Sequence, residues 1–364
     1  MTSIECDREG LTSEIAARAP AHGTAFRALH LRWVGDAAET ADWTVRESAI
    51  DKRPRGSLGA AAAIRPPSLT AAADAIVLEI PASSFQPILF PHRNPLKSLF
   101  CLPLLIPFLW NYLILLSFLA RAGKPLVIFD LQDSAGIAAR FLPLLKIAAC
   151  YHKRELPRCV ANAFQHSEIF AIEPWRNRLR YAGEIAKLRP LSIGAAFAPI
   201  PFRLRTREID IFWAGTLDNS PARERGVRLL RALEQEGYRV VILEERLDRE
   251  AFLEHLARAS LTFCPDGNGW QCWRMLEAGC LGSVPLLSYP TIWQDQPLRH
   301  GEHCFYFNPD GDDIKEIVRA ALADREHLRQ MSAALREFVT SSHVEAAVYY
   351  RHLGGLHDQC PHRH

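Results

Sequence analysis

Short apolar runs recur along this chain, and each is rich in branched or aromatic residues and ends in a turn signal. The runs lie at residues 25–35, 74–81, 124–134, 167–174 and 189–197, and then at 209–217, 238–245, 261–269, 283–289 and 303–310. Longer stretches with helical spacing separate them. This alternation is typical of βαβ units and predicts an α/β protein with parallel sheets.

Helix boundary signals mark the second half. Ser220 and Pro221 suit the N-cap and first position of a helix that Gly237 can end, and Asp248 suits the cap of the next helix. Residues 198–208 are polar and rich in arginine, which predicts an interdomain linker. The predicted parts are a disordered N-terminus at 1–24, an N-terminal Rossmann-like domain at 25–200, a C-terminal Rossmann-like domain at 201–350 and a flexible tail at 351–364. Two such domains that face each other bind ligands in the cleft between them, beyond the carboxyl ends of their strands.

Composition and charge narrow the class of protein. Of 364 residues, 48% are apolar and 23% are charged, which excludes a mostly disordered, collagenous or coiled-coil chain. Lys and Arg number 43 against 41 Asp and Glu, so the net charge of +2 gives no reason to expect a nucleic-acid partner. Nine cysteines without framework spacing and the acidic start MTSIECDREG favour a reducing, cytoplasmic location. The lack of a CxxC pair argues against a structural zinc site.

The stretch Ser98–Ala120 contains no charged residue, and its length makes it a candidate for a transmembrane helix. Pro103 and Pro107 are expected to break its first half and leave about 14 helical residues, too few to span a bilayer. We expect a buried helix. The alternatives are a true span and a helix lying in a membrane surface, with peripheral membrane contact through residues 99–120.

The segment 264–287, CPDGNGWQCWRMLEAGCLGSVPLL, carries the strongest chemical signal. A strand ends at its first residue, Gly267 and Gly269 let the backbone approach a ligand, and the N-terminus of the following helix favours a phosphate. Arg274 and Glu277 share one face of that helix. The arginine can bind diphosphate oxygens and the glutamate can accept from ribose or sugar hydroxyls. Alternatively, the two residues pair with each other on a solvated face.

In this segment Glu277, Ala278 and Gly282 hold the places of those residues in the motif GFG-x-x-x-x-E-A-x-A-x-G-x-P, and Pro285 stands one position after the place of its proline. Residues 209–340 thereby resemble the C-terminal domain of the group 1 glycosyltransferases, which have the GT-B architecture of two facing Rossmann-like domains. Arg274, three residues before Glu277, makes the motif closer to the exostosin-like and spore-coat-protein-like branches. Three other segments resemble parts of the family: FWAG at 212–215, LRHGEHCFYFNPDGDDIKEIVRAAL at 298–322 and YHKRELP at 151–157.

The resemblance implies a glycosyltransferase that moves a sugar from a nucleotide-diphospho-sugar to a hydroxyl of a glycan or lipid-linked acceptor. Arginine and helix dipole would meet the phosphate charge, so neither a metal nor another cofactor is expected. The residues it implies for the donor are Gly215, Thr216, Gly267, Asn268, Gly269, Arg274 and Glu277. Many retaining members carry two glutamates eight positions apart, and here Gly269 stands at the first position, which favours an inverting branch.

An inverting transferase needs a general base. Asp130 and Asp133 in FDLQDS follow a predicted strand and are the candidates; helix capping or turn formation is the alternative. The residues His152–Glu155 are either a second candidate cluster or a solvated charge run, and Glu173 ends another predicted strand.

Two further functions fit the same fold, because fold alone does not select an activity. One is a sugar-nucleotide epimerase, which would interconvert sugars without an acceptor. The other is a non-catalytic GT-B-like protein that binds a nucleotide sugar or serves as a scaffold, and it would bind the donor without turnover.

Overall fold

The computed structural model describes residues 25–34, 37–46, 49–58, 70–81, 102–138, 141–164, 174–194, 205–217, 220–245 and 247–354. Four predicted features lie wholly or mostly outside these residues: the N-terminus 1–24, the domain boundary at residue 200, the strand at 167–174 with Glu173, and the end of the tail from residue 355. The chain divides into two compact units. Unit 1 comprises Met1–Ile128, Ile147–Ala149 and Glu345–His364, and unit 2 comprises Phe129–Lys146 and Cys150–Val344.

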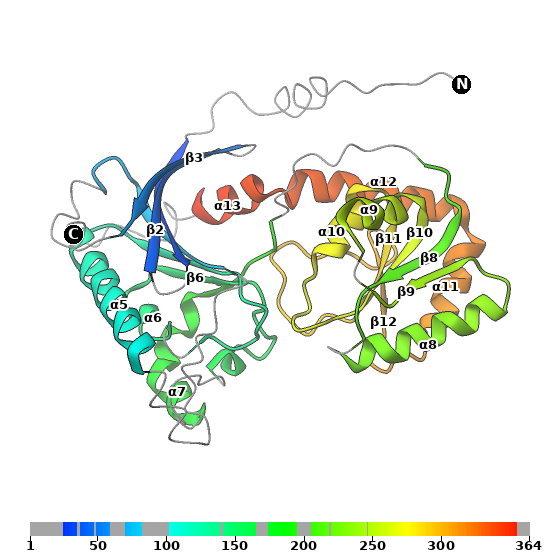
Figure 1. Cartoon of the computed structure of the whole chain (residues 1–364), viewed down its shortest axis with the longest axis horizontal. Helices are drawn as coiled ribbons and strands as arrows, with labels where there is room; N and C mark the ends of the chain where they lie inside the picture. Colours follow the sequence, from blue (N-terminus) through cyan, green and yellow to red (C-terminus); the bar gives the residue numbers. More distant parts are fainter. Residues whose placement is uncertain are drawn as a thin grey trace. The chain divides into compact units, whose positions relative to one another are not determined.

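Unit 1 is built on a sheet in which the strands run in the order β3-β2-β1-β4 and continue into the start of β5. Figure 1 labels β2 and β3 of this sheet. Its strands are β1 (Phe26–Val34), β2 (Ala37–Arg46), β3 (Ala49–Ser57), β4 (Ala75–Ile80) and β5 (Leu126–Asp130). β1 pairs with β4 in parallel, but β1 with β2 and β2 with β3 are antiparallel pairs. Helices α5 (Leu102–Ala122) and α13 (Glu345–Gly354) belong to the same unit.

The antiparallel strands β2 and β3 are a feature that the sequence pattern did not predict. Asp51, Arg53 and Arg55 alternate along β3 with other polar or small residues and are exposed, so no apolar run marks the strand. β3 is the last strand in its part of the sheet, and an edge strand tolerates both charged side chains and a proline such as Pro54. Strand formation here depends on pairing with β2 rather than on burial of side chains on both faces.

Helix α5 corrects the expectation that prolines would break the apolar stretch. It begins at Leu102 and contains both Pro103 and Pro107. Proline is tolerated in the first turn, where the missing N–H has no acceptor within the helix, and Pro107 removes only one further backbone bond. One face of the helix is buried through Tyr112, Leu115, Phe118, Leu119 and Ala122. Among the described helices, none combines the length and the apolar character that crossing a membrane would need.

The first part of unit 2 continues from β5 in the strand order β5-β6-β7. β6 (Cys150–Lys153) and β7 (Leu188–Pro190) pair in parallel. The short helices of this region are α6 (Leu144–Ile147), η1 (Val160–Phe164), α7 (Pro174–Tyr181) and η2 (Ala182–Lys187), where η denotes a 3₁₀ helix.

The larger part of unit 2 is an all-parallel sheet in the order β12-β11-β10-β8-β9. Its strands are β8 (Ile209–Ala214), β9 (Val240–Leu243), β10 (Ala259–Cys264), β11 (Val284–Ser288) and β12 (Phe305–Phe307). Its helices are α8 (Pro221–Gln235), α9 (Arg249–Arg258), α10 (Trp273–Cys280), α11 (Ile314–Ala323) and α12 (Arg325–Ser342). The prediction of an α/β protein whose two sheets contain parallel strands is confirmed.

Alternation along β8 shows how helices cover both faces of this sheet. Ile211 and Trp213 join a buried cluster with side chains of α8 and α11, whereas Phe212 and Ala214 join a cluster with side chains of α9 and α10. The strand order reverses between β8 and β10. The next strand in the chain after β8 is β9, which lies on one side of β8, and the strand after that, β10, lies on the other side. Ligands of doubly wound sheets bind at this kind of switch point, beyond the carboxyl ends of the strands.

The predicted helix boundaries of this region are confirmed. The Ser220 side chain accepts a hydrogen bond from the Ala222 N–H, and the Asp248 carboxylate accepts one from the Ala251 N–H at 2.8 Å. Gly237 has φ of +93°, the conformation in which glycine ends a helix at low cost.

Candidate functional site

The switch point of unit 2 brings together two segments that the sequence analysis singled out. β8 ends at Ala214 and leads into Gly215 and Thr216, and β10 leads into the loop 265–272 that precedes α10. These strands are neighbours in the sheet and run in parallel, so their carboxyl ends lie at one edge. We call this edge, formed by Gly215, Thr216 and the loop 265–272, together with the arginines that contact it, the switch-point site.

Arg274 connects the two segments. Its Nη2 group donates to the carbonyl oxygen of Ala214 at 2.7 Å, so an arginine of α10 reaches the end of β8. Gly215 has φ of +152°, and a Cβ at this position would lie 3.2 Å from Arg274 Nη2. The Nε–H group of Arg274 is buried and has no hydrogen-bond acceptor within the described part of the chain. Arg274 therefore has one buried donor that these contacts leave unsatisfied.

Arg223 is a second arginine at this site, and sequence reasoning missed it. From the first turn of α8 it donates through Nε to the carbonyl oxygen of Asp266 at 3.3 Å and through Nη1 to that of Thr216 at 3.2 Å. A Cβ on Gly267 would lie 2.3 Å from Arg223 Nη2, so glycine is required at this position for the guanidinium to pass.

The electrostatics of the switch-point site favour an anion. Burial and the positive charge of Arg274 both lower the pKa of Arg223. Each guanidinium donates to backbone carbonyls, and across the described ranges neither forms an ion pair with a carboxylate. The N-terminus of α10, with Cys272 as its N-cap, adds a further partial positive charge. Two arginines beside a helix N-terminus are suited to phosphate oxygens.

Glu277 lies one turn further along α10, and it does not pair with Arg274. Its side chain is 7% exposed and forms an ion pair with Arg249 at the start of α9. The interpretation of Arg274 and Glu277 as a pair on a solvated face is therefore wrong. The predicted role of Glu277, accepting hydrogen bonds from a donor's hydroxyls, stays a prediction, as do those of Thr216 and the exposed Asn268.

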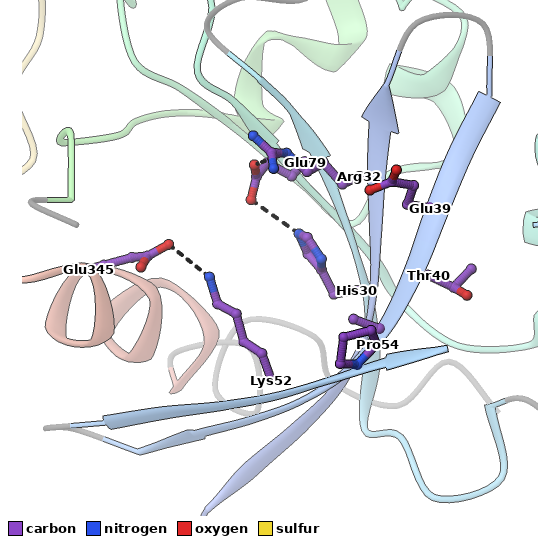
Figure 2. A pocket seen from close by; sticks show the side chains of 9 residues that line it. His30, Arg32, Glu39, Thr40, Lys52, Pro54, Glu79 and Glu345 are labelled. Atoms are coloured by element: carbon purple, nitrogen blue, oxygen red, sulfur yellow. Dashed lines mark hydrogen bonds and ion pairs between the residues drawn. The ribbon is translucent and has the colours of Figure 1, made fainter. Parts of the chain in front are cut away.

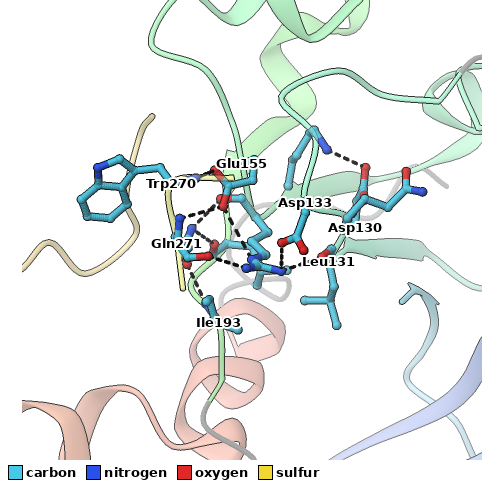
Figure 3. Close-up of polar contacts among 11 residues, drawn as sticks. Asp130, Leu131, Asp133, Glu155, Ile193, Trp270 and Gln271 are labelled. Atoms are coloured by element: carbon cyan, nitrogen blue, oxygen red, sulfur yellow. Dashed lines mark hydrogen bonds and ion pairs between the residues drawn. The ribbon is translucent and has the colours of Figure 1, made fainter. Parts of the chain in front are cut away.

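The far end of the loop is held by Glu155, which follows β6. Its Oε2 atom accepts the Trp270 N–H at 2.7 Å, and its Oε1 atom accepts the Gln271 N–H at 2.9 Å (Figure 3). A Cβ on Gly269 would lie 2.7 Å from Glu155 Cδ, so the backbone and the carboxyl group are in close contact. Burial raises the pKa of Glu155, against the opposing effects of Arg154 and the two N–H groups. We call this arrangement the Glu155 latch.

Gln271 and Arg154 extend the latch. The Gln271 side chain accepts from the Ile193 N–H at 2.8 Å and donates to the Leu191 carbonyl at 2.9 Å and to the Arg154 carbonyl (Figure 3). The Arg154 guanidinium donates back to the Gln271 carbonyl. The loop before α10 is thus fixed to the region of β6 and β7 by reciprocal hydrogen bonds, which restricts its backbone.

The run His152–Glu155 is not a solvated charge run, because all four side chains are buried. Lys153 is fully buried and pairs with Asp130 at 3.0 Å. Asp130 also accepts from the Tyr151 hydroxyl at 2.8 Å, and its own exposure is zero. A carboxylate enclosed in this way cannot reach an acceptor hydroxyl, so the geometry argues against Asp130 as the general base.

Asp133 occupies a different environment. Its side chain is 43% exposed and forms an ion pair with Arg154. Because Arg154 also contacts the Gln271 carbonyl, a single side chain connects Asp133 to the loop of the switch-point site (Figure 3). Asp133 is therefore the candidate base that we retain.

The thiol of Cys272 has a pKa well below that of an ordinary cysteine. A hydrogen bond with Cys264 and the charge of Arg274 outweigh burial and lower the pKa of Cys272 to about 6. The pKa of Cys264 itself is raised, mainly by burial. Helix N-termini and nearby arginines stabilise thiolates in this way. In the described ranges, no group of three His, Cys, Asp or Glu side chains could hold a metal ion.

No protein-family model and no curated protein matches the chain. Among solved structures, the GtfA/B complex is similar over 87% of this chain and 65% of that chain, with 10% identity and a TM-score of 0.47. Sucrose-phosphate synthase from Thermosynechococcus elongatus is similar over 91% and 98%, with 13% identity and a TM-score of 0.46. Anabaena HepE in complex with UDP is similar over 92% and 100%, with 12% identity and a TM-score of 0.42. At these TM-scores the similarities assign neither a residue role nor an activity to this chain.

Proposed function

We propose that this protein is a glycosyltransferase of the GT-B type that binds a nucleotide-diphospho-sugar at the switch-point site and transfers the sugar to a glycan or lipid-linked hydroxyl. The observation that carries the proposal is the convergence of Arg223 and Arg274 beyond the ends of β8 and β10, where neither forms an ion pair with a carboxylate of the described residues. The motif resemblance around Arg274 and Glu277 supports the same assignment.

In this proposal the two arginines and the N-terminus of α10 bind the diphosphate. Negative charge grows on the diphosphate as the bond to the sugar breaks, so donors fixed in place lower the barrier. Their positive charge makes a divalent ion unnecessary. Gly215 and Gly267 leave room for the guanidinium groups, and the Glu155 latch holds the loop between them.

The proton of the acceptor hydroxyl goes to a general base, which we assign to Asp133 in an inverting transfer. Its partial exposure gives it access to a substrate, and its ion pair with Arg154 holds the carboxylate beside the loop that precedes α10. An Asp133→Asn variant should bind the donor with unchanged affinity but turn it over at least about 100-fold more slowly.

The acceptor is proposed to be lipid-linked on the evidence of helix α5. Its exposed side chains include Leu109 at 46%, Trp110 at 63% and Leu113 at 59%, which form an apolar face suited to a membrane surface. Flotation with phosphatidylglycerol-containing vesicles tests this part. Wild-type protein should float with the vesicles and a Trp110→Ser/Leu113→Ser variant should not, whereas absence of wild-type protein from the vesicle fraction removes the membrane contact.

The donor site is tested by thermal unfolding with UDP, ADP, GDP, CDP and TDP and their sugars, with EDTA present. A ligand at about 100 times its Kd adds roughly 2.7 kcal/mol of stability to the folded state. The wild type should show a raised Tm with one base, and Arg274→Ala should lose the rise. Arg231→Ala is the matched control, because this arginine of α8 pairs with Glu244 at the surface and should leave the rise intact.

If none of these nucleotides raises the Tm of the wild type, the proposed function is overturned. Donor binding without transfer to any acceptor identifies a nucleotide-sugar-binding scaffold instead, and interconversion of the donor sugar without an acceptor identifies an epimerase.

A further inference from the structure

Unit 1 contains a polar pocket that the switch-point site does not involve. Its volume is about 280 Å³, and its charged lining comes from three strands of the antiparallel region, from β4 and from the start of α13 (Figure 2). The charged and titratable residues of its lining are His30, Arg32, Glu39, Lys52, Glu79 and Glu345. We call it the unit 1 pocket.

The strand register explains why charged groups meet there. Arg32 of β1 stands opposite Glu39 of β2 and opposite Glu79 of β4. His30 lies two residues before Arg32 on the same strand, so its side chain projects from the same face of the sheet. Lys52 reaches this face from β3, and its Nζ atom lies 3.1 Å from the Glu345 carboxylate (Figure 2).

The inner end of the pocket is a buried polar group centred on Glu79. His30 Nε2 lies 3.1 Å from Glu79 Oε2, and Arg32 Nε lies 3.2 Å from Glu79 Oε1. Burial lowers the pKa of His30, so the imidazole is neutral near pH 7. Burial alone would raise the pKa of Glu79, but His30 and Arg32 lower it overall, so this group is a carboxylate. Apolar side chains of similar volume would stabilise the fold at least as well as these buried charged groups do. The stability of the fold therefore does not explain why charged residues lie here.

The charge of the lining selects the class of ligand. Arg32 and Lys52 supply two positive charges, and Glu39, Glu79 and Glu345 supply three negative charges. With His30 neutral, the pocket has a small excess of negative charge, and its two cations are already paired with carboxylates. Such a lining disfavours phosphates, carboxylates and anionic headgroups. Among the described residues that line it, none is a Phe, Tyr or Trp on which a nucleobase could stack.

Hydroxyl groups suit this lining because each can donate to a carboxylate and accept from an ammonium or guanidinium. The volume lies just below the roughly 300–1,000 Å³ of ordinary small-molecule sites, so the ligand is small. We propose that the unit 1 pocket binds a neutral sugar residue, held at the rim by Lys52 and Glu345 and at the inner end by the group around Glu79. The identification of this sugar as part of the acceptor rests on the proposed function; the binding itself does not.

The test is calorimetric titration of the full chain with the methyl glycosides of glucose, galactose, mannose and N-acetylglucosamine, without nucleotide. Lys52→Ala and Glu345→Gln each remove one charge-assisted hydrogen bond at the rim and should raise the Kd of the bound glycoside by about tenfold. Both positions are partly exposed, so their ion pair contributes little to folding and the variants should keep the wild-type Tm.

Arg53→Ala is the matched control, because Arg53 neighbours Lys52 on β3 but is 81% exposed and pairs with Asp51. It should bind the glycoside with unchanged affinity. The proposal is overturned if no glycoside binds, or if Lys52→Ala and Glu345→Gln bind it as the wild type does. Tighter binding of glucose 6-phosphate or glucuronate than of the neutral glycosides also overturns it.

The outcome is independent of the donor site. Arg274→Ala should bind glycosides as the wild type does, since Arg274 belongs to unit 2. Glycoside binding without any nucleotide binding would leave the unit 1 pocket established and the proposed function rejected. Nucleotide binding without glycoside binding would reject the sugar site in the unit 1 pocket and leave the donor site of the proposed function intact.

Discussion

The loop between β10 and α10 is held by opposite charges at its two ends. At its first end, Asp266 and Gly267 contact the guanidinium of Arg223. At its second end, Gly269, Trp270 and Gln271 contact the carboxylate of Glu155. The carboxylate is nearly enclosed and accepts from backbone N–H groups. The arginines donate to backbone carbonyls and, among the described residues, form no ion pair with a carboxylate. The comparison teaches that one end of the loop serves the fold and the other is ready for a ligand.

The largest effect is expected at the second end. Glu155→Ala leaves the buried N–H groups of Trp270 and Gln271 without acceptors, which should lower the free energy of unfolding by about 3 kcal/mol. Urea denaturation measures this loss. Glu302→Ala is the control, because its ion pair with Arg299 lies at the surface and should cost under about 0.5 kcal/mol. Equal stability of the two variants would show that the Glu155 latch does not hold the loop.

At the first end, Arg223→Ala should act on the ligand instead. We expect the affinity for the preferred nucleoside diphosphate to fall by about tenfold or more, because one of two charge-assisted phosphate contacts is lost. The free energy of unfolding should change by less than about 1 kcal/mol. Arg225→Ala, two residues along α8 and paired with surface aspartates, should leave the affinity unchanged. Calorimetric titration measures the affinity of both variants for the nucleotide. Equal affinities of Arg223→Ala and Arg225→Ala would show that Arg223 does not contact the nucleotide.

The two glycines sharpen the comparison. Gly269→Ala presses a methyl group against the immobile Glu155 carboxyl group and should cost about 1 kcal/mol of folding stability. Gly267→Ala meets only the end of the Arg223 side chain, which can move, so it should weaken nucleotide binding about threefold at little cost in stability. Gly183→Ala meets no atom within 4 Å and serves as the neutral control. If both loop variants change the same property, the division between the ends is wrong.

The smallest effect concerns reactivity. Cys272 is the last residue of the loop and the N-cap of α10. Its pKa of about 6 means that it is mostly thiol below pH 6 and mostly thiolate above. Its alkylation by iodoacetamide, followed by peptide mass spectrometry, should therefore rise to half its maximum near pH 6. Burial raises the pKa of Cys304 to about 12, so that residue should stay unmodified over the same range. Arg274→Ala should move the Cys272 midpoint to higher pH; an unchanged midpoint would separate this thiol from the arginine.

Local signals explain what could be predicted of the fold. The caps at Ser220 and Asp248 and the strands of the all-parallel sheet were predictable, because each depends on a few adjacent residues. β2 and β3 were not, since their polar residues become a strand only when paired with each other. Helix α5 was misjudged because Pro103 lies in the first turn, where proline is tolerated, and because the helix continues past Pro107 despite the backbone bond lost there.

The candidate site was predictable to the extent that it follows the chain. Gly215, Gly267 and Arg274 were recognisable from a strand, a turn and a helix in succession, and the structure brings them together. Glu155 was not, because its partner Trp270 is 115 positions away and a run of charged residues gives no sign of burial. Arg223 was missed because one arginine in a helix rich in charged residues has no distinguishing pattern.

The Glu155 latch also limits how this protein can be cut or recombined. A segment that starts at residue 205 contains every strand of the all-parallel sheet and both arginines, yet it lacks the carboxylate that orders the loop between them. Such a fragment would have to order its own loop on each encounter with a nucleotide, which lowers its apparent affinity by the fraction of time the loop is correctly shaped. Exchange of this half between related proteins should therefore succeed only when residues 150–155 are inherited with it.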